Sequence, residues 1–193
     1  MFTFRKEDHS YWLSDRRLDG VTETLTAAGM IDGSFFTEES CVRGAYVHRA
    51  TEMVDKGSLD WGALDPVLLP YCLAYKKFVE DIRPEILLSE KPMYHANYLF
   101  AGTPDRAMRI NGRTAIIDFS TGSPPPAKRI QVAAYRELVL VSEDIFASHG
   151  YTLWLKNDGD YRLSLPIGLK EMRRDYQIFL AALSVVRWRK ENL

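Results

Sequence analysis

The stretch GTPDRAMRINGRTAIIDFSTG, residues 102–122, decides the fold that we predict for this chain. Within it, two short runs with apolar or alternating character, 106–110 and 114–119, flank the pair Asn111-Gly112. An Asn-Gly pair favours a type I′ turn, because both residues tolerate the positive φ that this turn requires. The stretch therefore predicts a β-hairpin of two adjacent antiparallel strands.

The same hairpin carries an acidic residue on each strand at its open end. Asp105 lies six residues before the turn and Asp118 lies six residues after it, so the two side chains are expected to meet. Converging carboxylates repel each other unless a cation neutralises them. Mg²⁺ suits this task, since it binds one or two carboxylates and keeps positions for water and phosphate. On spacing alone, two unrelated surface aspartates are the simpler interpretation, and the neighbouring segments must support a metal site.

The rest of the chain predicts helices on both sides of a small sheet. Periodicity and turn signals predict helices at about 39–56, 70–82, 127–141 and 168–190, and strands at 86–88, 98–101, 106–110, 114–119, 151–156 and 161–165. The first 35 residues are rich in turn signals. This order predicts an α/β (α+β) fold with a small mixed central sheet flanked by helices. Without an internal repeat or a long linker, residues 1–193 are expected to form a single domain.

Composition excludes several classes of protein. The 193 residues are 46% hydrophobic, 26% charged and 12% aromatic, which is ordinary for a globular domain and excludes a disordered tail or a coiled-coil rod. The net charge of −1 gives no bulk positive field. Cys41 and Cys72 are too few for a disulfide scaffold or a four-thiolate cluster. No apolar stretch reaches the ~18 residues of a membrane helix, and a signal-peptide core is missing. We therefore expect no membrane partner and a cytoplasmic, intracellular location.

The predicted helix before the sheet places a histidine beside the acidic end. Gly44, His48 and Glu52 recur four residues apart, so they share one helix face. His48 could bind a metal, and Glu52 could hold its other ring nitrogen or pair with an arginine. A lone helix histidine is more often a satisfied, half-buried group, and this remains the alternative.

The predicted helix after the hairpin carries a polar stripe. Lys128, Gln131 and Tyr135 lie at positions i, i+3 and i+7, which form one face. Burying such a stripe against the acidic end of the sheet would be costly without polar partners. The alternative is a solvent-exposed polar face.

This ordered set of residues resembles the PD-(D/E)XK nuclease superfamily, in the RecB-like branch that includes phage recombination exonucleases. The matching pieces cover about residues 20–140 and are Gly-Val-Thr at 20–22, Gly44-x-x-x-His48-x-x-x-Glu52, Glu90, Gly102-Thr-Pro-Asp105, Ile116-Ile-Asp118 and Gln131-x-x-x-Tyr135. The resemblance implies a restriction-endonuclease-like core. It also implies a metal-dependent DNA nuclease, an exonuclease that hydrolyses phosphodiester bonds in DNA recombination, repair or phage DNA processing.

The resemblance also implies roles for individual residues. His48, Asp105, Asp118 and the Phe119 carbonyl would coordinate Mg²⁺ or Mn²⁺, Gln131 and Tyr135 would line the DNA side of the site, and Glu90, like Glu52, would support the ligands. DNA is the implied partner, joined by a single-strand annealing protein as a candidate, and an oligomer is compatible with the branch. If the chain is phage-encoded, its location is the host cytoplasm.

Local positive charge supports phosphate binding near these residues. Residues 83–130 carry seven basic and four acidic groups, although the whole chain is close to neutral. We expect Arg106 and Arg129 from this stretch to contact DNA phosphates, which would make binding sensitive to salt and independent of sequence.

One position departs from the family pattern. The family has acid-x-Lys where this chain has Asp118-Phe119-Ser120, and a serine hydroxyl can hold a water molecule but brings no charge. Three interpretations follow: the metal suffices alone, the cationic group has moved to Lys128, or the site is degenerate and binds DNA or a partner without cleaving. Our working hypothesis is the second, so the expected catalytic set is Asp105, Asp118, Ser120 and Lys128.

Overall fold

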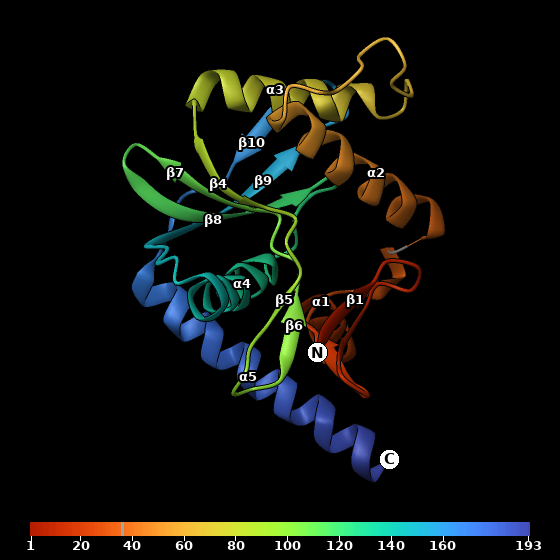
Figure 1. The fold of residues 1–193 in the computed structure, drawn as a ribbon, viewed down its shortest axis with the longest axis vertical. Helices are drawn as coiled ribbons and strands as arrows, with labels where there is room; N and C mark the ends of the chain where they lie inside the picture. Colours follow the sequence, from red (N-terminus) through yellow and green to blue (C-terminus); the bar gives the residue numbers. More distant parts are fainter. Residues whose placement is uncertain (36) are drawn as a thin grey trace.

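The computed structural model describes residues 1–35 and 37–193, and within these residues the chain forms five α-helices and two β-sheets (Figure 1). The strands are β1 (Phe2–Arg5), β2 (Ser10–Leu13), β3 (Arg16–Gly20), β4 (Glu85–Ser89), β5 (Met93–Tyr94), β6 (Phe100–Gly102), β7 (Arg106–Ile110), β8 (Arg113–Ser120), β9 (His149–Leu155), β10 (Tyr161–Leu163) and β11 (Ile167–Gly168). The helices are α1 (Val21–Ala27), α2 (Glu38–Asp55), α3 (Leu69–Ile82), α4 (Lys128–Glu143) and α5 (Leu169–Asn192), with a 3₁₀ turn at Gly33–Phe35. None of these described helices has the length and apolar character to cross a bilayer.

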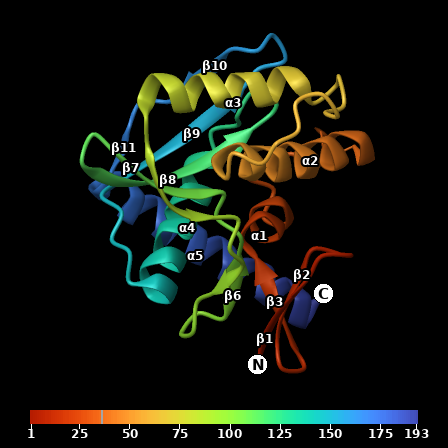
Figure 2. The same cartoon turned by 45° about the horizontal axis from the view of Figure 1, so that its top comes forward.

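The larger sheet is mixed and lies between two pairs of helices. Its strand order is β10-β9-β8-β7-β4, with β11 paired to β9; β8 and β9 run parallel, and the other neighbours in the order run antiparallel. Helices α2 and α3 cover one face, and α4 and α5 cover the other (Figures 1 and 2). Successive residues of β8 alternate between two cores, since Ile117 packs with α3 residues and Ile116 packs with α4 and α5 residues. The predicted class, mixed α/β with flanking helices, is confirmed.

The predicted hairpin forms as the Asn-Gly signal indicates. Asn111 and Gly112 have φ values of 49° and 76°, and β7 pairs with β8 from Ile110↔Arg113 to Arg106↔Ile117. This register places Asp105 and Asp118 opposite each other at the open end of the hairpin. The adjacency of the two acidic residues is therefore confirmed.

The N-terminal segment is more regular than its turn signals predict. Strands β1, β2 and β3 join β6 and β5 in a second sheet, in which β3 runs parallel to β6 through the pairs Asp19↔Phe100 and Gly20↔Ala101. The expectation of turns fails because these strands are only four or five residues long and expose one face. In β3, for example, Arg16 and Arg17 are exposed while Leu18 is buried, which conceals the strand in an average of hydrophobicity.

The long helix α5 connects the two sheets. Near its C-terminal end, Arg187 donates from Nε to Asp19 Oδ2 at 2.7 Å and from its terminal nitrogens to the carbonyls of Tyr98 and Leu99. Lys190 donates to the other oxygen of Asp19 at 2.8 Å. Burial alone would raise the pKa of Asp19, but these two cations together lower it below its ordinary value. The pair therefore ties α5 to the smaller sheet.

Replacement of Gly150 by alanine is expected to destabilise this arrangement. Gly150 lies in β9 beneath α4, and an added Cβ would lie 2.4 Å from Cγ1 of Val132 and 3.1 Å from Sδ of Met172. Such overpacking should lower the free energy of unfolding by ~1–3 kcal/mol, measured by urea denaturation. Gly122→Ala is the matched control, because a Cβ there meets no atom within 4 Å. Equal stability of the two variants would contradict the close contact.

Candidate metal centre

Three residues from separate segments meet beside the open end of the hairpin. His48 lies in the second half of α2, Glu90 follows β4, and Asp105 precedes β7. His48 Nδ1 lies 3.0 Å from Glu90 Oε1 and 3.3 Å from Asp105 Oδ1. Each residue offers one ligand atom within 4.8 Å of the other two. We call these three residues the acid–histidine cluster.

The backbone fixes the position of Glu90 in this cluster. The chain turns sharply after β4, so Glu90 has a left-handed φ of 46°. Its N–H donates to the carbonyl oxygen of Asp105 at 3.1 Å, which holds the two acidic residues side by side. Sequence comparison with the family assigned Glu90 only a supporting role, whereas the structure places its carboxylate directly against His48.

The carboxylates of the cluster determine the protonation of His48. Burial alone would lower the pKa of this imidazole, but the charges and hydrogen bonds of Asp105 and Glu90 outweigh it and raise the pKa to about 10. In the protein alone, a protonated His48 therefore holds the two carboxylates together. A divalent cation could take over that role, because it also neutralises the carboxylates and the imidazole then binds as a neutral ligand.

Arg106 supports the cluster from inside the protein. Its side chain is 0% exposed and donates to Asp55 Oδ2 at 2.7 Å, Glu90 Oε1 at 2.9 Å, Thr51 Oγ1 at 3.2 Å and the Asp105 carbonyl at 2.6 Å. The expectation that Arg106 contacts DNA phosphate is therefore wrong. Buried arginine needs compensating charge, and Asp55 and Glu90 supply it. Arg106 instead fixes the carboxylate of Glu90.

Asp118 lies next to the cluster but pairs with Lys128. The Lys128 ammonium donates to Asp118 Oδ2 and, at 2.9 Å, to the carbonyl of Phe119. One peptide group connects this second subsite to the cluster, since the Phe119 N–H donates to Asp105 Oδ2 at 2.5 Å. We call Asp118, the Phe119 carbonyl and Lys128 the lysine-capped subsite.

The predicted four-ligand set is therefore divided between two subsites. His48 and Asp105 come together with Glu90, whereas Asp118 and the Phe119 carbonyl are engaged by Lys128. Burial raises the pKa of Asp118 to about 7, and the ammonium of Lys128 opposes this rise. Among the described residues, Asp118 Oδ1 is buried without a hydrogen-bond partner.

The polar stripe of α4 is buried beside this subsite. Gln131 Nε2 donates to the Tyr135 hydroxyl at 3.0 Å and to Thr22 Oγ1 at 3.1 Å. Both Gln131 and Tyr135 are about 5% exposed, so the alternative of a solvent-exposed stripe is wrong. Gly102 makes room for the Tyr135 ring, because a Cβ there would lie 2.7 Å from its Cε1. The stripe therefore forms one wall beside the acidic residues.

Three further residues of the predicted site have partners elsewhere. Glu52 accepts a hydrogen bond from Lys56 at 2.7 Å, so its predicted support of His48 is corrected to an exposed i, i+4 ion pair. Arg129 donates to Asp175 at 2.5 Å and lies 3.5 Å from Glu171, so it joins α4 to the first turns of α5. Its predicted phosphate contact would have to compete with these two carboxylates. Ser120 Oγ donates to the Gly122 carbonyl at 2.7 Å.

The donor set and its charge fit one divalent cation. An imidazole and carboxylate oxygens suit Mg²⁺ or Mn²⁺. Around the cluster, the three carboxylates of Asp55, Glu90 and Asp105 face the single guanidinium of Arg106, so the formal charge is −2 when His48 is neutral. The side chains of His48 and Glu90 are 29% and 19% exposed, which leaves the cluster open to solvent. The buried oxygen of Asp118 without a partner lies beside it.

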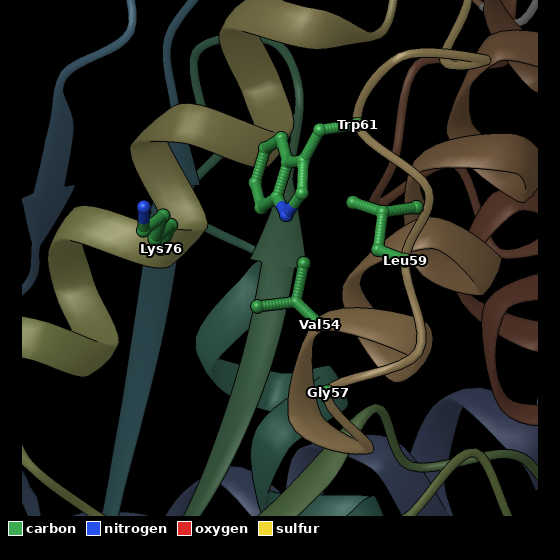
Figure 3. A pocket seen from close by; sticks show the side chains of 5 residues that line it. All are labelled: Val54, Gly57, Leu59, Trp61 and Lys76. Atoms are coloured by element: carbon green, nitrogen blue, oxygen red, sulfur yellow. The ribbon is translucent and has the colours of Figure 1, made fainter.

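A pocket elsewhere does not compete for this assignment. It has a volume of about 180 Å³ and lies between the C-terminal end of α2 and α3 (Figure 3). Its described lining is Val54, Gly57, Leu59, Trp61 and Lys76, which includes no carboxylate or imidazole. The chemistry of the chain is therefore concentrated at the two adjoining subsites.

Comparison with known proteins gives limited similarity. No protein-family model matches the sequence, and no curated protein matches it either. An alkaline exonuclease, LHK-Exo, from Laribacter hongkongensis is similar in structure at 14% identity and a TM-score of 0.40, over 89% of this chain and 91% of that one. LHK-Exo in complex with dAMP is similar at 12% identity and a TM-score of 0.36, over 90% and 92% of the two chains. Likeness at this level assigns no activity, so function must be argued from the site itself.

Proposed function

We propose that this chain is a metal-dependent DNA nuclease that hydrolyses phosphodiester bonds, acting as an exonuclease in DNA recombination, repair or phage DNA processing. The observation that carries the proposal is the acid–histidine cluster, whose net charge of −2 lies one peptide group from a lysine ammonium. Negative charge that needs a divalent cation, beside positive charge that suits phosphate, is what phosphodiester hydrolysis requires.

The residues of the cluster would hold Mg²⁺ or Mn²⁺ through His48, Glu90 and Asp105. When bound, the ion supplies Lewis acidity and lowers the pKa of a coordinated water molecule. The protein fixes the ligands through two hydrogen bonds: Arg106 holds the Glu90 carboxylate, and the Phe119 N–H holds Asp105 Oδ2. Such supporting bonds orient ligands and preserve affinity for the metal.

The lysine-capped subsite would act on the substrate. Asp118 fixes the Lys128 ammonium beside the cluster, where it would stabilise the charge that develops on the phosphate oxygens. Lys128 would thus supply the positive charge that Ser120 does not bring. Gln131 and Tyr135, which are hydrogen-bonded to each other, would line the same wall toward DNA.

A second candidate function is DNA or partner binding without cleavage. Two observations favour it: Ser120 Oγ is engaged by the Gly122 carbonyl, and Lys128 already pairs with Asp118. In that case the ammonium would substitute permanently for a cation. In either case, we propose DNA as the partner, a single-strand annealing protein as an associated partner, and the cytoplasm as the site of action.

The deciding experiment is digestion of linear double-stranded and single-stranded DNA with Mg²⁺ or Mn²⁺. Wild-type protein should degrade at least one substrate, and EDTA should stop it. Lys128→Ala should lower the rate by at least ~10²-fold, because a positioned donor at a developing charge is worth about that much. Its control is Lys170→Ala, an exposed lysine on α5.

The possible outcomes separate the two functions. Normal cleavage by Lys128→Ala would remove Lys128 from the mechanism while leaving the nuclease proposal in place. Retention of DNA on a gel without any cleavage by wild-type protein would instead identify the non-cleaving alternative.

A further inference from the structure

We infer that the centre binds one divalent cation rather than two, and that the Lys128 ammonium is the built-in cation of the lysine-capped subsite. This inference rests on the proposed function, since it specifies how the metal centre of that nuclease is organised. It concerns Lys128 as a residue that determines metal stoichiometry, in addition to its proposed contact with phosphate.

The geometry separates the two acidic groups at the open end of the hairpin. His48, Glu90 and Asp105 bring their ligand atoms within 4.8 Å of one another, and among the described residues no such set of three includes Asp118. The peptide N–H of Phe119 lies between the subsites and takes up Asp105 Oδ2 at 2.5 Å. The oxygen of Asp105 that could have bridged two cations is therefore already engaged by a backbone donor.

Lys128 occupies the donor atoms that a second cation would need. Its ammonium donates both to Asp118 Oδ2 and to the Phe119 carbonyl, and its side chain is only 18% exposed. What remains at this subsite is Asp118 Oδ1, a single oxygen. One carboxylate oxygen gives too few protein donors to hold Mg²⁺ against an adjacent ammonium.

The charges of the two subsites differ in the same sense. The acid–histidine cluster and its buried partners carry −2 with a neutral His48, whereas Asp118 and Lys128 form a neutral pair. Lys128 is also the first residue of α4, a helix whose first turn contains no acidic side chain. The positive end of the helix dipole therefore adds to the charge of the ammonium. Both effects favour a divalent ion at the cluster and oppose one at Asp118.

The test is the number of Mn²⁺ ions bound, measured by isothermal titration calorimetry and by electron paramagnetic resonance, which detects coupling between neighbouring Mn²⁺ ions. Wild-type protein should bind one ion at this centre without such coupling. Glu90→Gln should weaken that ion at least ~10-fold. Lys128→Met should release Asp118 and the Phe119 carbonyl, so this variant should bind a second Mn²⁺ that couples to the first.

Controls and contrary outcomes are distinct from those of the nuclease assay. Lys170→Met should behave as wild type, and Lys128→Gln, which can still donate to Asp118, serves if the methionine variant does not fold. Two coupled ions in a wild-type protein that digests DNA would overturn the inference and leave the proposed function intact. One ion in both wild type and a folded Lys128 variant would also overturn it. A wild-type protein that binds no Mn²⁺ overturns both proposals.

Discussion

Asp105→Asn should abolish Mg²⁺-dependent DNA cleavage, with kcat/KM at least ~10³-fold lower than in wild type. The substitution removes one of three ligands and one negative charge from the acid–histidine cluster, and a catalytic ion supplies several kcal/mol of transition-state stabilisation. The asparagine oxygen can still accept the hydrogen bond of the Phe119 N–H. The fold should therefore survive, and steady-state kinetics on labelled DNA should show the loss.

Glu52→Gln is the matched control for Asp105→Asn. It makes the same change from carboxylate to amide on the helix that carries His48, but Glu52 pairs only with Lys56 in the described contacts. Exposed ion pairs of this kind contribute little, so activity and stability should remain close to wild type. Cleavage by Asp105→Asn at the wild-type rate would show that the cluster is not the catalytic centre.

Arg106→Met should produce the largest loss of stability among the substitutions considered. The side chain is 0% exposed and is hydrogen-bonded to Asp55, Glu90, Thr51 and the backbone of Asp105. Removal of one partner from a buried ion pair leaves uncompensated charge and costs ~3–5 kcal/mol. For a chain of this size, the melting temperature should fall by about 10 °C, which differential scanning calorimetry can measure.

The comparison for Arg106→Met is Arg109→Met on the same strand. Arg109 pairs with Glu85 at 2.5 Å, but both side chains are about half exposed, at 46% and 58%. Its replacement should change the free energy of unfolding by less than ~1 kcal/mol. If the two variants melted together, the buried network around Arg106 would have no special weight.

The local parts of the fold could be predicted because their signals are local. Asn111-Gly112 specified a hairpin, and that hairpin alone placed Asp105 opposite Asp118. The expected helix 70–82 appears as Leu69–Ile82, and the expected helix 39–56 appears as Glu38–Asp55. Apolar periodicity and helix-ending residues are encoded within a few positions, so tertiary contacts change them little.

The parts that failed depend on contacts between distant segments. Glu90 became a candidate ligand, and Arg106 a buried support, only because α2 brings Asp55 and His48 onto the same side of the sheet. No spacing in the sequence distinguishes Arg106, which is buried, from Arg109, which is exposed and three residues away. Alternation in β7 could have suggested opposite faces for the two residues, but it could not have identified Asp55 as the partner.

The parallel pairing of β3 with β6, closed by Arg187 of α5 on Asp19, has a consequence for biosynthesis. Arg187 and Asp19 are 168 residues apart in sequence. At ~5–20 residues per second, the ribosome adds this arginine about 10–30 s after the aspartate. Closing so long a loop is also slow. The nascent chain therefore spends this interval with β3 lacking its final clasp, and the smaller sheet matures only at a late stage of translation.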